Sequence, residues 1–269
     1  MKQAWALIRS ELWQRRWALM WWSIAIVAFI VLNLAFYPSF KDQAGELDKA
    51  LSNMPDSLKA LFTDTGDFTS PVGYLSSQIY YLLLPALLTV YSIGIGASLL
   101  AKEEQQGTLE LLLARPLSRT KLLISKLIAG LLGLLFLGTI ALIVSVISVH
   151  LVGLEVSRLA VAVTTLDAML LAGLFGAIAF MFSALGRPAR LASIGIASLV
   201  AFGGYIISSL DQTVTVLTWP AKLLPYHYYT PAEILRGTTS GKWQMLGFLI
   251  ASLLLFVIAW IGFRRRDIG

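Results

Sequence analysis

The sequence predicts an all-α integral membrane protein with six transmembrane helices, and three observations lead to this prediction. Hydrophobic residues make up 57% of the chain and charged residues only 13%, against about 25% charged residues in an ordinary soluble domain. Six stretches are apolar over the length of about 20 residues that a spanning helix needs. Segments of about ten residues with alternating polarity, which would indicate a membrane β-barrel, do not occur. We therefore expect residues 1–269 to form a single transmembrane domain.

Residues 1–16 precede the first span and predict an amphipathic helix. Trp5, Ile8 and Leu12 recur at helical spacing, whereas Arg9, Glu11, Gln14 and Arg15 face elsewhere. Such a helix suits the headgroup layer, where tryptophans anchor and arginines meet anionic lipid. The expected interfacial anchors are Trp5, Arg9, Arg15 and Arg16. The alternative is a charged leader that only sets the topology.

The six expected transmembrane helices cover residues 17–37, 79–100, 122–149, 166–185, 191–210 and 245–263. Lys126 falls in the first turn of the third stretch, so the apolar part of that helix begins nearer Leu127. The first apolar stretch is too long for the core of a signal peptide and is expected to be retained. Residues 38–78 are too few for a catalytic domain with its own core and are expected to form a small external cap, with short helices at 44–51 and 57–62.

Lysine and arginine counts predict the orientation of these helices. Fourteen of the 21 basic residues fall in the segments on one side of the expected helices, and seven fall on the other side. Because cytoplasmic loops carry the excess of Lys and Arg, both termini are expected in the cytoplasm, and residues 38–78 and 211–244 outside. The positive net charge then needs no nucleic-acid partner. We expect a multi-pass protein of the plasma membrane of a prokaryotic cell.

The segment between the second and third expected spans, residues 101–121, holds the most informative pattern. Thr108 is suited to cap a helix that begins at Leu109, and Gly107 allows the turn before it. Pro116 ends that helix, and Ser118 is suited to cap the third span near Arg119. A helix of two turns is not stable alone in water. From the residues alone, it is either a loop folded onto the headgroups or a docking element for a partner.

Several motifs in this segment resemble the signature of ABC-2 type transporter permeases. The chain reads Lys102-Glu103-Glu104-Gln105-Gln106-Gly107-Thr108-Leu109-Glu110, then Arg115-Pro116-Leu117-Ser118-Arg119, then Lys126. In that family an acidic pair precedes Gly-Thr-Leu-Glu, a Pro-x-Ser-Arg turn follows, and a lysine opens the third helix. The ending Phe263-Arg264-Arg265-Arg266-Asp267-Ile268 is also similar to the family's usual terminus.

The resemblance implies a permease that works as a homodimer or heterodimer and binds two copies of a separate ATP-binding subunit. ATP and Mg would then bind to that partner, and no cofactor to this chain. The short cytoplasmic helix between spans two and three would be the coupling helix that contacts the ATP-binding subunit. The residues carried over to this role are Glu103, Glu104, Gly107, Thr108, Leu109, Glu110, Leu112, Leu113, Arg115, Pro116, Ser118 and Arg119.

Small residues in the fourth and fifth spans predict close helix packing, within one subunit or across a dimer. They are Gly173, Gly176, Ala197, Ala201 and Gly204. Asp167 lies near the outer end of the fourth expected span. We interpret it as an acid near a helix N-terminus and close to water, with a functional intramembrane charge as the alternative.

Residues 211–244 are too apolar for a free loop and too rich in proline for a span. Their aromatic residues suit the outer interface, and the segment is either a lid that re-enters the membrane or a plain interfacial belt.

The sequence also excludes several functions. It holds no cysteine and only two histidines, which excludes disulfides and disfavours metal centres. No phosphate-binding loop is present, so the chain is not expected to be an enzyme that hydrolyses ATP. We therefore expect a permease subunit of an ABC exporter for an amphiphilic substrate such as a drug, antibiotic, peptide or lipid. A non-transporting membrane scaffold that docks a cytoplasmic partner is the alternative.

Overall fold

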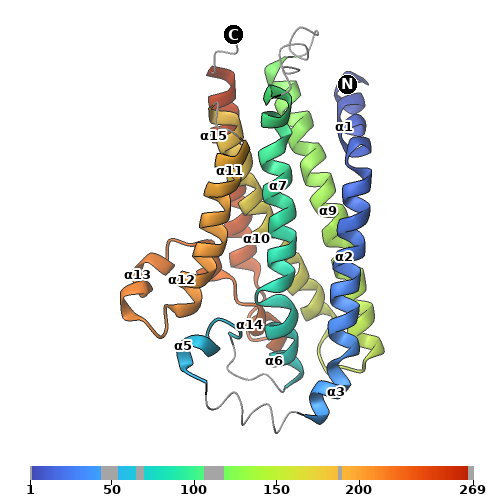
Figure 1. Cartoon of the computed structure of the whole chain (residues 1–269), viewed down its shortest axis with the longest axis vertical. Helices are drawn as coiled ribbons and strands as arrows, with labels where there is room; N and C mark the ends of the chain where they lie inside the picture. Colours follow the sequence, from blue (N-terminus) through green and yellow to red (C-terminus); the bar gives the residue numbers. More distant parts are fainter. Residues whose placement is uncertain (1, 44–53, 65–69, 106–117, 187–189, 266–269) are drawn as a thin grey trace.

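The computed structural model describes residues 2–43, 54–64, 70–105, 118–186 and 190–265. Within these residues it contains helices and turns and no strand. Six helical segments are long and apolar enough to cross a membrane: Arg16–Asp42, Pro71–Leu100, Arg119–Leu151, Arg158–Leu185, Arg190–Leu210 and Lys242–Arg265. They run side by side as a bundle, with both chain termini at the same end (Figure 1). The predicted all-α fold with six spanning helices is confirmed.

The chain begins with α1 (Lys2–Gln14), α2 (Arg16–Ala35) and α3 (Tyr37–Asp42). The second span contains α6 (Pro71–Leu75), η1 (Ser76–Tyr80) and α7 (Leu83–Gln105), and a short helix, α5 (Asp56–Lys59), precedes it. Spans three and four are α9 (Arg119–Leu151) and α10 (Arg158–Leu185). The fifth span contains α11 (Arg190–Ser198), η2 (Leu199–Gly203) and α12 (Gly204–Leu210), and the sixth is α15 (Lys242–Arg265).

Four short helices connect the fifth span to the sixth: η3 (Thr215–Leu217), α13 (Thr218–Ala221), η4 (Pro225–Tyr228) and α14 (Pro231–Arg236). They lie at the end of the bundle opposite the termini (Figure 1). Prolines begin both η4 and α14. Because proline lacks an N–H and favours the first turn of a helix, it breaks this segment into pieces rather than allowing a seventh span. Ala232, Ile234 and Leu235 of α14 are buried, since α14 packs against α10, α6 and η1.

Helix α10 lies at the centre of the bundle and packs against α7, α9, α11 and α15. Its fully buried side chains include Phe175 and Phe180. Helix α2 of the first span is peripheral, and its buried residues form the stripe Ile26, Ile30 and Leu34. Other apolar side chains of α2, including Trp21, Ile24 and Leu32, are exposed, as expected for side chains that face lipid or another membrane subunit.

Two spans contain one wider, π-helical turn each. The turn η1 stands directly before Tyr81, and η2 stands shortly before Tyr205. The two tyrosine rings pack edge to face with centroids 5.6 Å apart. Single π-helical turns inside α-helices are frequent at functional sites.

Two spans begin earlier than the sequence suggested. The second starts at Pro71 rather than at residue 79, and the fourth starts at Arg158 rather than at residue 166. In both cases the added turns contain small or hydroxyl side chains, such as Ser76 and Thr164, that are fully buried against neighbouring helices. Burial inside the bundle removes the need for an apolar surface, so hydropathy alone does not mark the start of these two helices.

Candidate functional site at the end that carries both termini

The site begins where α7 and α9 converge on the segment that resembles a coupling element. Glu103 and Glu104 lie in the last turn of α7, which ends at Gln105. The predicted coupling residues Gly107, Thr108, Leu109, Glu110, Leu112, Leu113, Arg115 and Pro116 lie outside the described residues. Ser118 caps α9, because its hydroxyl accepts a hydrogen bond from the Lys121 backbone N–H at 3.3 Å. Arg119 is the first residue of that helix.

A buried ion pair joins the start of α9 to α1. The Lys126 Nζ atom lies 2.6 Å from Glu11 Oε2, and both side chains are at most one-tenth exposed. Arg15 lies 2.7 Å from the other carboxylate oxygen of Glu11 through its Nη2 atom. One carboxylate therefore receives charge-assisted hydrogen bonds from two cations, which are among the stronger bonds in proteins.

The pKa of Glu11 reflects this arrangement. Burial raises the pKa of the carboxyl, but the charges and hydrogen bonds of Lys126, followed by those of Arg15, outweigh burial and lower it below 4.5. Glu11 is therefore ionised at neutral pH. A buried ion pair gives little net stability relative to an apolar pair, but loss of one partner is costly because the other charge stays buried. The cluster therefore fixes the position of α1 against α9 strongly.

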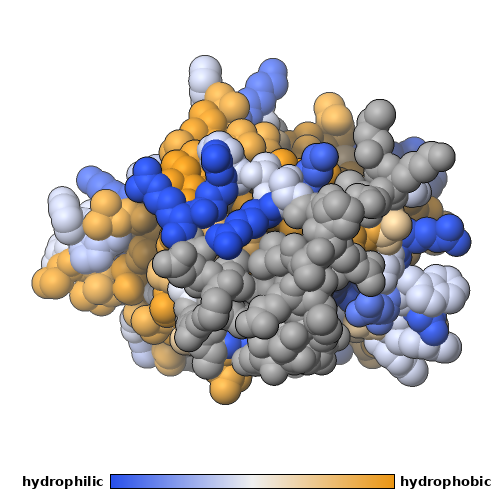
Figure 2. All heavy atoms as spheres, turned by 90° about the horizontal axis from the view of Figure 1, so that it is seen from above, coloured by the Kyte–Doolittle hydropathy of each residue, from blue (hydrophilic) through white to orange (hydrophobic). Residues whose placement is uncertain are grey.

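The last helix also contacts the start of α9. The Trp260 indole N–H of α15 donates a hydrogen bond to the Thr120 hydroxyl at 3.2 Å. The Arg264 guanidinium lies over the Trp260 ring, 5.0 Å from its centroid, within the range of a cation–π interaction. The first turns of α9 are thus held by α1 on one side and by α15 on the other. Seen from this end, hydrophilic side chains lie beside the residues drawn in grey and also reach part of the margin, with apolar side chains between them (Figure 2).

The N-terminal helix is amphipathic, but its orientation differs from that of a helix lying flat in the headgroup layer. It continues nearly in line with α2 (Figure 1) and packs lengthwise on α9. The Glu11–Lys126 pair accounts for this orientation. Trp5 and Arg9 are exposed, as an anchoring role requires. Arg15 instead binds Glu11, and Arg16 stacks on two tryptophans, Trp13 and Trp17.

Sequence reasoning placed Glu11 on the polar face and so missed it as a site residue, because its partner lies 115 residues away. The sequence did offer one signal: Glu11 and Lys126 carry opposite charges, and both were expected near the membrane boundary.

Deeper in the bundle, α7 and α10 cross at two glycines. A Cβ atom on Gly96 would lie 2.3 Å from the Gly176 carbonyl oxygen, and one on Gly176 would lie 2.9 Å from the Cβ of Ser92. Only glycine permits this approach. Of the other predicted packing residues, Gly173 faces Leu134 of α9 and Gly204 faces Leu224. Ala197 and Ala201 are buried.

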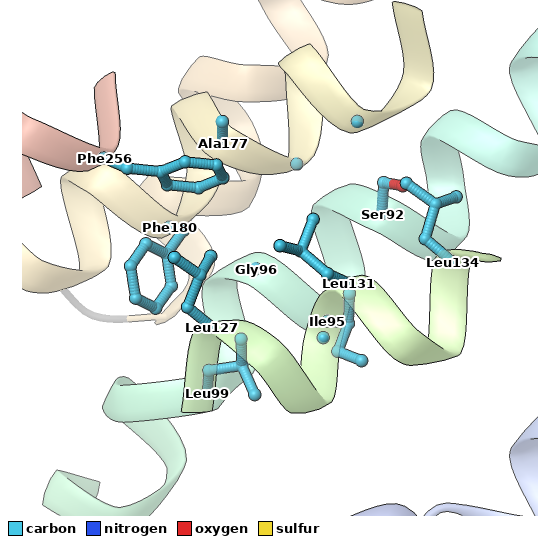
Figure 3. A pocket seen from close by; sticks show the side chains of 13 residues that line it. Ser92, Ile95, Gly96, Leu99, Leu127, Leu131, Leu134, Ala177, Phe180 and Phe256 are labelled. Atoms are coloured by element: carbon cyan, nitrogen blue, oxygen red, sulfur yellow. The ribbon is translucent and has the colours of Figure 1, made fainter. Parts of the chain in front are cut away.

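The crevice beside this crossing is small. Leu127 and Leu131 of α9, Phe180 of α10 and Phe256 of α15 converge on it (Figure 3). Its volume of about 30 Å³ is far below the roughly 300 Å³ of a small ligand pocket. The centre of a single chain is therefore closed at this level.

The structure corrects the interpretation of Asp167. Its helix begins at Arg158, so Asp167 lies in the third turn rather than at the N-terminus, and its side chain is fully buried. One carboxylate oxygen accepts a hydrogen bond from the Gln244 amide at 2.6 Å. The other has no hydrogen-bond partner among the described residues. Asp167 is thus a buried polar contact between α10 and α15, not an acid exposed to water.

Comparison with known proteins agrees with this architecture. A family model described as ABC-2 family transporter protein matches residues 5–268. The chain is also 27% identical over 224 residues to YhcI, an uncharacterized protein of Bacillus subtilis (strain 168), with 73% of this chain and 69% of YhcI covered. The family match covers the six spans and the segment between α7 and α9. The chain therefore belongs to the ABC-2 transporter family and is a multi-pass membrane permease subunit.

Proposed function

We propose that this chain is the membrane-spanning half of an exporter whose energy comes from ATP hydrolysis on a separate ATP-binding subunit. The observation that carries the proposal concerns the segment between α7 and α9, residues 106–117: the helix that follows this segment is anchored to other parts of the bundle. Helix α7 ends directly before residues 106–117 and α9, capped by Ser118, begins directly after them. Helix α9 is held by the Glu11–Lys126 pair and by Trp260. A partner that pushes on residues 106–117 would move α9, α1 and α15 together.

The length of α9 supports this mechanical role. Its 33 residues correspond to about 50 Å at 1.5 Å per residue, whereas the hydrocarbon core of a bilayer is about 30 Å thick. Helix α9 is therefore longer than the hydrocarbon is thick, and we expect its basic first turns, with Arg119, Lys121 and Lys126, to be the part that extends towards the partner. A nucleotide-dependent movement of the ATP-binding subunit favours one of two permease states only if its contacts differ between them.

The closed centre of the chain favours a route between two permease subunits. The crevice at the Gly96–Gly176 crossing is too small for an amphiphile, whereas α2 and α15 expose most of their apolar surface. A second permease subunit, identical or different, would cover part of this surface. We place both termini and the α7–α9 segment in the cytoplasm of a prokaryotic cell, on the basis of the distribution of Lys and Arg.

The coupling role is tested by reversing one charge in the segment. Glu110→Lys should abolish transport and co-purification of the ATP-binding subunit while leaving insertion and abundance near normal. Truncating one partner of a buried charge pair at an interface costs about 2–5 kcal/mol, which weakens docking about 30-fold to several thousand-fold. Leu112→Asp should act similarly by placing a charge in an apolar contact.

Glu155→Lys is the matched control. Glu155 is exposed between α9 and α10, at the opposite end of the bundle, so the same charge reversal there should leave transport and co-purification unchanged. Normal transport in both segment variants would refute the coupling role. Normal co-purification without any transport by the wild-type complex would instead favour a scaffold. The purified chain alone should not hydrolyse ATP, and turnover by it would contradict the division of labour.

A further inference from the structure

A cavity of about 240 Å³ lies at the end of the bundle opposite the termini. Its wall combines four parts of the chain: the turn after α5, Tyr81 between η1 and α7, helix α12 with the two residues that follow it, and the segment from η4 to α14. These short elements gather around this end in Figure 1. A cavity of about 150 Å³ holds a benzene molecule, so this one has room for a small organic group or for the head group of a larger molecule.

Four tyrosines form a continuous aromatic wall. Tyr81 packs on Tyr205, Tyr205 on Tyr226, and Tyr226 on Tyr229, with centroids 5.6, 5.5 and 6.0 Å apart and rings at 63°, 70° and 90°. All four line the cavity. Successive rings are steeply inclined to one another, and Tyr226 also stacks on Phe175 of α10.

Hydrogen bonds to the backbone hold these rings in place. The Tyr81 hydroxyl donates to the Ala60 carbonyl at 2.8 Å, and the Tyr229 hydroxyl donates to the Tyr80 carbonyl at 2.8 Å. The Tyr205 hydroxyl donates to the Leu61 carbonyl. Because these three hydroxyl groups already donate their protons to backbone carbonyls, a ligand would interact with the aromatic rings rather than with hydroxyl donors. A preformed wall also lowers the entropy cost of binding.

Acidic side chains outnumber basic ones around the cavity. Asp64, Asp211 and Glu233 line it, and Arg236 is the sole lysine or arginine among its described lining residues. The Asp211 carboxylate lies 2.9 Å from His227 Nδ1. Asp64 accepts hydrogen bonds from the Ser76 hydroxyl and the Ala232 N–H. Burial raises the pKa of Asp64 despite these bonds and the nearby Arg236, so the negative charge at the cavity rests mainly on Asp211 and Glu233. The surroundings therefore favour a positive charge over a negative one.

We propose that this cavity binds an organic ammonium group. A cation over aromatic faces gains about 2 kcal/mol or more when both are desolvated, and the carboxylates add attraction of the same sign. An inorganic metal ion fits less well, because no group of three or more His, Cys, Asp or Glu side chains within the described ranges is arranged to hold one. The buried Ser208 hydroxyl, which has no hydrogen-bond partner within those ranges, would bind a hydroxyl or N–H of the ligand.

This inference rests on the proposed function and deepens it, because it assigns a cationic head group to the exported amphiphile. The apolar remainder of such a molecule would lie outside the cavity, since the enclosed volume accommodates the head alone. Binding to the purified chain requires neither the ATP-binding subunit nor transport. Failure of this inference is therefore distinguishable from failure of the coupling role.

The test compares choline with 3,3-dimethyl-1-butanol, a neutral molecule of the same shape, by titration calorimetry on the purified full-length chain in lipid nanodiscs. Choline should bind at least about tenfold more tightly than its neutral analogue, which corresponds to about 1.4 kcal/mol. Equal affinity for the two molecules, or no detectable binding of choline, would overturn the proposal. Tighter binding of acetate than of choline would do so as well.

Variants locate the site. Tyr226→Leu removes a ring and should weaken choline binding at least about tenfold, whereas Tyr226→Phe keeps the ring and should remain within about threefold of wild type. Tyr228→Leu is the matched control, because Tyr228 belongs to the same η4 turn but is half exposed and outside this cavity.

Elution volume and Tm show whether Tyr226→Leu folds. If it does not, Asp211→Asn provides the second readout. This change should weaken choline binding and leave the neutral analogue unaffected. Equal losses for both molecules would contradict a site for charge.

Discussion

The Glu11–Lys126 pair allows a quantitative test of how the N-terminal helix is held. Lys126→Met removes the ammonium group but keeps a side chain of similar length. At 2.6 Å and an effective dielectric constant of 20, the attraction between the charges is about 6 kcal/mol before desolvation is subtracted. Removal of one partner of a buried pair typically costs about 3–5 kcal/mol. Since Arg15 still binds Glu11 in this variant, we expect a loss near 3 kcal/mol.

The measurement is the Tm of the purified protein in detergent, followed by intrinsic tryptophan fluorescence. A loss of about 3 kcal/mol corresponds to a fall in Tm of roughly 6–12 °C for a chain of this size. Glu11→Gln should fall by at least as much, because it removes the carboxylate that two cations share. The double variant Glu11→Leu/Lys126→Met should recover most of the loss, since an apolar pair can replace a buried ion pair.

The double variant makes the test specific, because recovery requires that the two side chains interact. If the two single losses simply add in the double variant, Glu11 and Lys126 do not form the pair described. Single variants whose Tm lies within about 2 °C of wild type, which corresponds to under about 1 kcal/mol, would likewise refute the buried geometry.

Three further predictions concern the same fold. The pKa of Glu11 is lowered in the folded chain, so the stabilising effect of its carboxylate is complete above the ordinary pKa of 4.5 and is lost as pH falls through the folded pKa. The Tm difference between wild type and Glu11→Gln should therefore shrink in acid. A Tm difference that does not change with pH would contradict this assignment. Gly96→Ala should destabilise by about 1–3 kcal/mol through overpacking, whereas Gly94→Ala, with nothing within 4 Å of the added carbon, should be nearly silent in the same Tm assay. A reporter fused after residue 269 should read as cytoplasmic and one inserted near Met54 as external, and the opposite result at either position would refute the assigned orientation.

Hydropathy was sufficient to predict the spanning helices because burial in lipid imposes the same requirement on every turn. It failed where protein replaces lipid as the neighbour. Asp167 shows this most clearly, since its partner Gln244 lies 77 residues further along the chain. A single sequence carries no signal that joins an acid in one span to an amide in another.

The Glu11–Lys126 pair and the tyrosine cavity differ in how far the sequence indicated them. Lys126 was visible as a charge at the start of an apolar stretch, and the family resemblance drew attention to it, but Glu11 as its partner was not visible. The tyrosine cavity was not predicted at all, because its wall comes from four segments far apart in the chain, and the hydrogen bond between Asp64 and Ala232 joins residues 168 positions apart. Only the density of aromatic residues in 211–244 hinted at a specific structure there.

The two π-helical turns have a consequence for how the chain compares with its relatives. A π turn holds one residue more than an α turn, and one residue corresponds to about 100° of rotation along a helix. Each of these turns therefore sets the direction of every side chain between itself and the end of its span. Deleting Val200 from η2 should turn Tyr205 away from Tyr81 without moving the residues of α11. In an alignment, a relative with a one-residue gap at this point is expected to lack the aromatic wall, even where every tyrosine is retained.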